Sequence, residues 1–140
     1  VVNNTPRNVP WYLPERARGL LVGYLGSNPD HQPYGLQKFQ WNPDTQQLEY
    51  AWVNADTSSP SSVPIVGMGS NLVYFVGARD NQFTLEALNW DTGAADFHYL
   101  IGGQRYNVMY SGTAIDEDGR IHYGTPWGRV RLTPKTTPGK

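Results

Sequence analysis

Polar and aromatic side chains that could do chemistry are grouped in a few short segments between apolar runs of the sequence. The candidate ligand-binding residues are Asp30 and His31, Arg79 and Asp80, Arg105 with Tyr106 and Asn107, and Trp127. A histidine beside an aspartate can serve as an oriented base, because a carboxylate on one ring nitrogen fixes the proton on the other. An arginine in a loop can clamp a carboxylate or a phosphate in a bidentate manner. Each segment also has a plainer interpretation, as a solvated loop or as a pair that caps a turn.

Other polar segments point to structure more than to chemistry. The run Asp116–Gly119 offers clustered oxygens to a hard cation, but it lacks the further ligands of a calcium loop and is interpreted as a turn. His98 and His122 match no zinc spacing. The sequence contains no nucleophile elbow and no glycine-rich phosphate loop between a strand and a helix. The sequence therefore leaves open whether the protein is an enzyme, and it leaves any cofactor unknown.

Composition excludes several classes of function. The 140 residues carry a net charge of −1, so there is no electrostatic footprint for nucleic acid. No cysteine is present, which excludes a disulfide scaffold and a thiol nucleophile, and no apolar run is long enough for a membrane span. Hydrophobic residues make up 39% and charged residues only 16%, so a core is expected beneath an uncharged polar surface. Such a surface is common in secreted proteins, and we predict an extracellular or periplasmic location.

The sequence repeats with a period of about 47 residues. The segment Trp41–Thr45 lies 47 positions before Leu88–Thr92. The same offset pairs Tyr50 with Phe97 and Trp52 with Tyr99, and a further shift pairs Gly77 with Gly124, Phe83 with Val130 and Leu85 with Leu132. Several apolar and glycine positions that match at one offset indicate a repeated structural unit.

Alternation of apolar and polar residues predicts that each unit is made of short strands. The middle unit is expected to hold strands at Ser62–Gly67, Leu72–Gly77, Gln82–Trp90 and Ala95–Ile101. The third shows Tyr110–Ile115, Arg120–Thr125 and Gly128–Leu132 without a fourth strand, and the first shows Leu20–Leu25, Gly35–Trp41 and Leu48–Val53. We therefore predict an extended arm at 1–19, repeated units at about 20–57, 58–105 and 106–132, and a Thr/Pro-rich tail at 133–140.

Four-stranded units of this length are typical of β-propellers. The middle unit resembles a blade of the quinoprotein-dehydrogenase-like (PQQ-like repeat) propellers, with a strand that ends in Gly77, the turn Asp91–Gly93 and an aromatic fourth strand. The resemblance covers about 20–132 and implies an all-β fold of two and a half to three four-stranded antiparallel blades. The first unit departs from the pattern, because Gln46 follows Asp44 and Thr45 where the turn has glycine. Cofactor ligands are not carried over, since such enzymes draw them from many blades.

A closed propeller has four or more blades, so three blades are not enough. Three readings follow: the chain is part of a longer protein, or further copies complete the ring, or the fold is an open β-sandwich. The expected partner is thus another polypeptide chain or another copy, with a small molecule or a glycan as a possible ligand.

In a propeller, the loops that join successive blades share one face with the loops between second and third strands. All the candidate residues above fall on that face. Two functions compete: a non-catalytic binding or scaffold module, and part of an enzyme, either an oxidoreductase or a hydrolase or lyase acting on sugars. A lectin-like repeat of sugar sites is disfavoured, because the corresponding loops of the units do not match.

Overall fold

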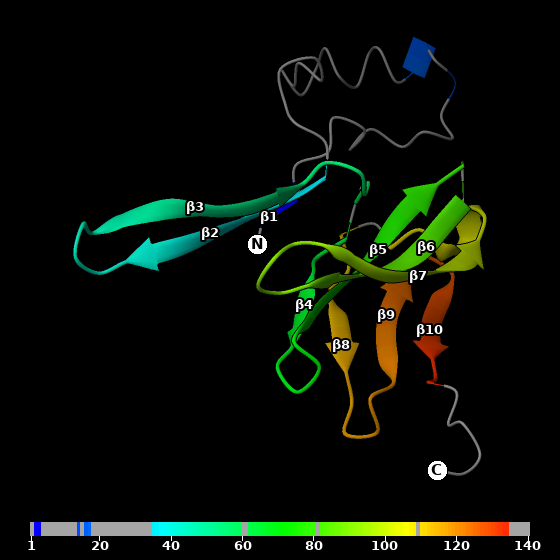
Figure 1. The fold of residues 1–140 in the computed structure, drawn as a ribbon. Helices are drawn as coiled ribbons and strands as arrows, with labels where there is room; N and C mark the ends of the chain where they lie inside the picture. Colours follow the sequence, from blue (N-terminus) through cyan, green and yellow to red (C-terminus); the bar gives the residue numbers. More distant parts are fainter. Residues whose placement is uncertain are drawn as a thin grey trace.

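The computed structural model describes residues 2–3, 14, 16–17, 35–59, 62–80, 82–108 and 110–134. In this part of the chain the protein is all-β, with three separate antiparallel sheets that follow one another along the sequence (Figure 1). The first holds β1 (Val2–Asn3), β2 (Leu36–Asn42) and β3 (Gln47–Asn54). The middle holds β4 (Ile65–Gly67), β5 (Leu72–Arg79), β6 (Gln82–Asn89) and β7 (Ala95–Gly102). After the 3-10 helix η2 (Gln104–Tyr106), the third holds β8 (Thr113–Ile115), β9 (Ile121–Thr125) and β10 (Gly128–Leu132).

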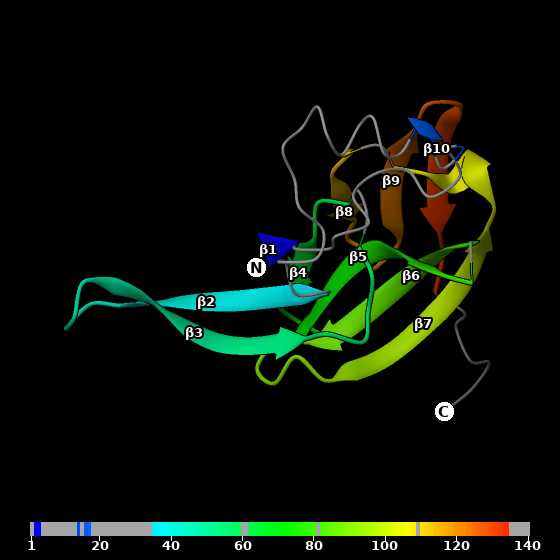
Figure 2. The same cartoon turned by 90° about the horizontal axis from the view of Figure 1, so that it is seen from above.

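The middle sheet is the centre of the molecule, because both of its faces are covered. On one face Val73, Phe75 and Leu88 pack with Leu36 and Trp52 of the first sheet. Alternate residues point to the opposite face. There, Val76 and Phe83 of the middle sheet pack with Val108 and with Tyr123 of the third sheet. The β2–β3 hairpin projects away from the other two sheets, as both views show (Figures 1 and 2).

The first and middle sheets follow the predicted offset of 47 residues. Asn42 and Asn89 close equivalent turns, since the side-chain oxygen of each accepts hydrogen bonds from the backbone N–H groups two and three residues later. Gln46 has a φ of 53° where Gly93 has 73°, so both occupy the left-handed region. Glutamine therefore stands at a position that favours glycine, and the unit keeps its turn despite this departure from the pattern.

The third sheet follows the middle one at an offset of 46, which corrects the predicted 47. In both sheets a two-residue turn joins the second and third strands, closed by Arg79 with Gln82 and by Thr125 with Gly128. One residue matters here, because a shift by one position moves every side chain to the opposite face. With the corrected offset, Tyr123 is the counterpart of Gly77. The face of the middle sheet that holds Gly77 packs against the first sheet. The face of the third sheet that holds Tyr123 packs against the middle sheet, so each sheet contacts the one before it through the equivalent face.

The strands at the inner edges of the middle and third sheets run parallel to each other. Val63 and Gly112 form an isolated parallel bridge just before β4 and β8. Because β5 and β9 are both antiparallel to these strands, the β5–β6 turn and the β9–β10 turn lie at the same end of the molecule. η2 follows β7 at this end too, and we call it the η2 end. The described strands form no closed ring or barrel.

Several strand boundaries differ from the prediction for local reasons. The expected strand Ser62–Gly67 begins at Ile65, since Pro64 has no N–H to donate to a ladder. Val2 and Asn3, expected in an extended arm, pair with Gln37 and Leu36. The predicted strand Leu20–Leu25 lies outside the described residues. Among the described residues, no helix has the length and apolarity that crossing a membrane requires.

Candidate functional site

The structure places the described candidate residues at the η2 end. Arg79 and Asp80 stand at the β5–β6 turn, Arg105 in η2, and Trp127 in the β9–β10 turn. Asp30 and His31 lie outside the described residues, so their place relative to this end is not defined. In the described part of the chain, no hydrogen bond or ion pair joins Arg79 or Asp80 to Arg105 or Trp127.

Arg79 is held by a partner that the sequence analysis overlooked. Its Nε and Nη2 donate to the two carboxylate oxygens of Glu86 at 2.7 and 2.9 Å, and the Thr84 hydroxyl donates to the same carboxylate at 2.6 Å. The Glu86 side chain is only 1% exposed, whereas Arg79 is 35% exposed. The hydrogen bond to Glu86 is the main cause that raises the pKa of Arg79, and Asp80 and Asp56 add to it. The Nε–Nη2 edge of the guanidinium is thus occupied by a buried carboxylate, so the ion pair is the main role of Arg79 and only its Nη1–Nη2 end could meet a ligand.

Gly77 leaves the room that Glu86 needs. A Cβ at Gly77 would lie 2.6 Å from Cγ of Glu86 and 2.7 Å from the carbonyl oxygen of Ser58. The backbone of Ala78 donates to that same oxygen at 3.1 Å, so the segment after β3 lies directly against β5. This glycine therefore serves close packing around a buried ion pair, not ligand binding.

The three candidates around η2 have different surroundings. Arg105 is exposed, while Tyr106 is half-buried and packs against the cluster of Val76, Phe83, Val108 and Tyr123. Gly102, with a φ of 142°, lets the Tyr106 ring lie against the backbone, since a Cβ there would come within 2.8 Å of the ring. Asn107 is 4% exposed and makes an interaction of its own. Arg105 is therefore the most accessible of the three, and Tyr106 packs into the core beneath the loop.

Asp80 and Trp127 occupy equivalent turns on neighbouring sheets. Asp80 is exposed and adopts a φ of 46°, and Trp127 is 66% exposed. The Trp127 backbone is fixed by the Thr125 hydroxyl, which accepts its N–H at 3.2 Å. With Arg105, these two residues give the η2 end a polar and aromatic rim that can contact a ligand.

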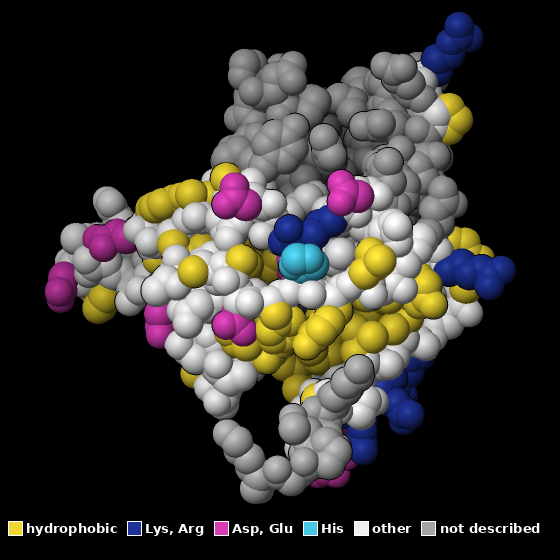
Figure 3. All heavy atoms as spheres, turned by 45° about the vertical axis from the view of Figure 1, so that its right-hand side comes forward, with side chains coloured by type: hydrophobic (Ala, Val, Ile, Leu, Met, Phe, Trp, Pro, Cys, Tyr) yellow, Lys and Arg dark blue, Asp and Glu magenta, His cyan; other side chains and the backbone are white. Residues whose placement is uncertain are grey.

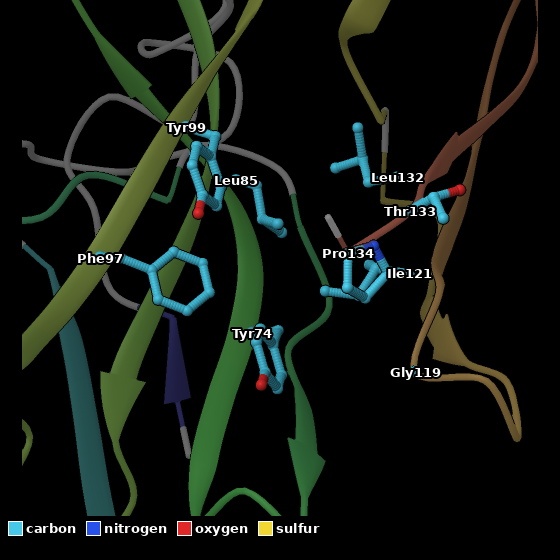
Figure 4. A pocket seen from close by; sticks show the side chains of 9 residues that line it. All are labelled: Tyr74, Leu85, Phe97, Tyr99, Gly119, Ile121, Leu132, Thr133 and Pro134. Carbon is cyan, nitrogen blue, oxygen red and sulfur yellow. The ribbon is translucent and has the colours of Figure 1, made fainter. Parts of the chain in front are cut away.

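Between the middle and third sheets lies an open groove of about 680 Å³. Tyr74, Leu85, Phe97 and Tyr99 line it from the middle sheet, and Ile121, Leu132 and Pro134 face them from the third (Figure 4). The rings of Phe97 and Tyr99 lie 5.1 Å apart between centroids, and those of Tyr74 and Phe97 lie 6.2 Å apart. We call this feature the aromatic groove. On this side of the molecule, hydrophobic side chains form a band below a group of basic side chains and a histidine (Figure 3).

The aromatic groove has a covered counterpart one unit earlier. Trp52, the counterpart of Tyr99, is 6% exposed because the β6–β7 turn lies over it. Its Nε1 donates to the carbonyl of Trp90 at 2.9 Å, and a Cβ on Gly93 would come within 2.5 Å of its ring. Lys38 reinforces this cover, with Nζ 2.8 Å from the Trp90 carbonyl and 3.9 Å from the centroid of its ring. None of the described residues covers Tyr99 in this way, and its side chain is 63% exposed.

The Asp116–Gly119 run forms the β8–β9 turn, as the sequence predicts. Asp116 accepts hydrogen bonds from the backbone of Asp118 and Arg120, and its Oδ2 lies 2.8 Å from Nε2 of His122. Nη2 of Arg129 lies 2.8 Å from the other ring nitrogen of His122. The hydrogen bond from His122 is the main cause that lowers the pKa of Asp116 to about 2. With both ring nitrogens engaged, His122 supports the turn and is not a free base. The described residues hold no group of three or more acidic, histidine or cysteine side chains arranged for a metal ion.

Two of these features had a signal in the sequence. The alternation of residues shows that Phe97 and Tyr99 stand on one face of their strand. An apolar face of this kind predicts a buried core, and the sequence does not show whether another segment covers it. Glu86 is a lone carboxylate in the apolar run Leu85–Leu88, and a charge in such a run needs a partner. That partner, Arg79, lies seven residues earlier across a hairpin.

Comparison with known proteins gives one curated relative. The chain is 36% identical over 121 residues to an uncharacterized protein of Archaeoglobus fulgidus, which covers 86% of this chain and 23% of the relative. The chain thus spans less than a quarter of the length of that protein. No protein-family model matches the chain, and no solved structure matches it at a significant level.

Proposed function

We propose that this chain is a segment of a β-propeller that acts as a non-catalytic binding or scaffold module, with the aromatic groove as its contact surface. The groove carries the proposal, because the exposed Tyr99 and the half-buried Tyr74 and Phe97 form an open apolar surface, and such a surface marks an interaction site. Its partner is a polypeptide, since the described lining is mostly apolar and holds no charged side chain that could pair with a phosphate or a carboxylate.

Two further observations support the propeller. Successive sheets present the same face to the sheet that follows, at offsets of 47 and 46 residues, as blades related by a rotation do. The parallel bridge between Val63 and Gly112 places the innermost strands of two units side by side, as around a common axis. The resemblance of the middle unit to PQQ-like propeller blades agrees with this arrangement.

The second candidate is part of a propeller enzyme with its site at the η2 end. The observation in its favour is that Asp80, Arg105 and Trp127 all reach solvent at that end. Alanine replacement of these three residues in the complete assembly separates the two functions. A scaffold keeps its partner after this change and loses it when Tyr99 is replaced by aspartate; an enzyme shows the opposite pattern in its activity.

The native mass tests the propeller itself. We expect the 15.7 kDa chain to associate with further copies or with another polypeptide when its mass is measured by native mass spectrometry with any co-purifying chains. A monomer that unfolds in one cooperative transition on heating would overturn the propeller and favour an open sandwich.

A further inference from the structure

We propose that the aromatic groove receives a β-strand that pairs with the free edge of β10 and forms the fourth strand of the third sheet. The occupant is extended polypeptide that follows position 140 in a longer protein, not a second copy of the chain. This inference rests on the proposed contact function of the aromatic groove and deepens it by naming the polypeptide that the groove contacts: the strand that follows in the same chain, not a separate protein.

The edge of β10 supplies the main-chain partner. β10 pairs with β9 on one side, and in the described part of the chain no strand pairs with its other side. In the middle sheet the equivalent strand, β6, is paired with β7 on that side from Phe83 to Leu88. An unpaired row of backbone N–H and C=O groups beside an apolar surface is a template for strand addition.

The groove supplies the side-chain contacts, and the first sheet shows how they are made. Trp52 is covered by the turn that joins the third and fourth strands of the next sheet, Trp90–Gly93. Tyr99 is the counterpart of Trp52 and needs the same turn from the third sheet. The groove is continuous with the interface of Phe83, Tyr123, Val130 and Leu132, so such a turn would extend an existing core.

The corrected offset locates this segment along the chain. At 46 residues, the counterparts of Trp90 and Gly93 are Thr136 and Gly139, and the counterpart of β7 begins at position 141. The described chain reaches the lip of the groove at Pro134, which lines it. The chain spans only 23% of the length of its Archaeoglobus fulgidus relative, and this favours a continuation of the same polypeptide over a second copy.

The test uses the 140-residue chain and two extended versions. In the first extension a copy of Ala95–Gly102 follows Lys140, so that the copy occupies the position of a fourth strand. The matched control carries serine at the copied counterparts of His98 and Leu100, the positions that would lie beside Val130 and Leu132 and face the groove. Nitration of Tyr99 by tetranitromethane reads the exposure of the groove, and amide hydrogen exchange reads the edge of β10.

We expect the first extension to slow nitration of Tyr99 about tenfold, as its exposure falls from 63% toward the 6% of Trp52, and to protect β10. The serine extension should change neither. Equal nitration in all three versions would overturn the strand site. If the protection of β10 rises with protein concentration and the measured mass doubles, the occupant is a second copy. That result would overturn the proposal that the strand comes from the same polypeptide. If the extension protects the groove but the 140-residue chain is a monomer in the native-mass measurement, the strand site stands and only the propeller is overturned.

Discussion

Replacing Arg79 by methionine should destabilise the fold, although Arg79 lies in a loop-face position that suggests ligand binding. Methionine keeps much of the apolar stem but removes the guanidinium, which leaves the carboxylate of Glu86 at 1% exposure with the Thr84 hydroxyl as its remaining side-chain donor. Removing one partner of a fully buried ion pair costs about 3–5 kcal/mol. Because Arg79 is 35% exposed and its charge is partly screened, we expect about 2 kcal/mol.

Urea unfolding followed by tryptophan fluorescence measures this change. A loss of about 2 kcal/mol lowers Tm by roughly 6 °C in a domain of this size. Arg105→Met is the matched control, since Arg105 is exposed at the same end, and a surface replacement of this kind stays within about 0.5 kcal/mol. A double-mutant cycle with Glu86→Gln should give a coupling of about 1–2 kcal/mol.

Two results would refute this reasoning. If Arg79→Met costs no more than Arg105→Met, the ion pair does not stabilise the fold. If the changes at Arg79 and Glu86 are additive, the two side chains do not act on each other. In either case Arg79 returns to the set of residues available to a ligand.

Three further predictions concern the turns and the groove. Gln46→Gly should raise the free energy of unfolding by about 0.5–1 kcal/mol, since glycine adopts the left-handed φ without the cost a side chain meets there. Trp52→Ala should cost about 3–5 kcal/mol and Tyr99→Ala less than about 1 kcal/mol, because the first is buried and the second exposed. Asp116 has its pKa lowered by His122 to about 2, so its contribution to stability is present above about pH 4 and is lost as the pH falls through 2.

Each of these predictions has its own check by urea unfolding. Gln47→Gly, one residue later and inside β3, should lower stability, so a gain there too would contradict the conformational argument. Equal costs for Trp52→Ala and Tyr99→Ala would contradict an uncovered groove. For the acid turn, Asp116→Asn and His122→Phe should each reduce the fall in stability between pH 4 and 2. An unchanged fall in both variants would show that this pair is not its source.

The strand content could be read from the sequence because each strand is a local pattern. Leu72–Arg79 and Gln82–Asn89 alternate and are bounded by short turns, so both were predicted within two residues. The turn at Asp91–Gly93 was predicted for the same reason, although the structure begins it one residue earlier, after Asn89, whose side chain caps it. The offset of the third sheet was wrong by one residue, since Gly124 and Val130 imitate a match that only the closing pair of a hairpin resolves.

The candidate site could be predicted less well, because side chains find their partners across strands. The sequence by itself determined that the chain is a series of antiparallel units, that their turns close where Asn42 and Asn89 stand, and that Phe97 and Tyr99 share a face. These are consequences of a two-residue side-chain period and of short-range hydrogen bonds. Tertiary structure alone decided that Arg79 pairs with Glu86, and that no described residue covers Tyr99 as the β6–β7 turn covers Trp52. Those outcomes depend on which sheet lies against which, and that contact joins residues far apart along the chain.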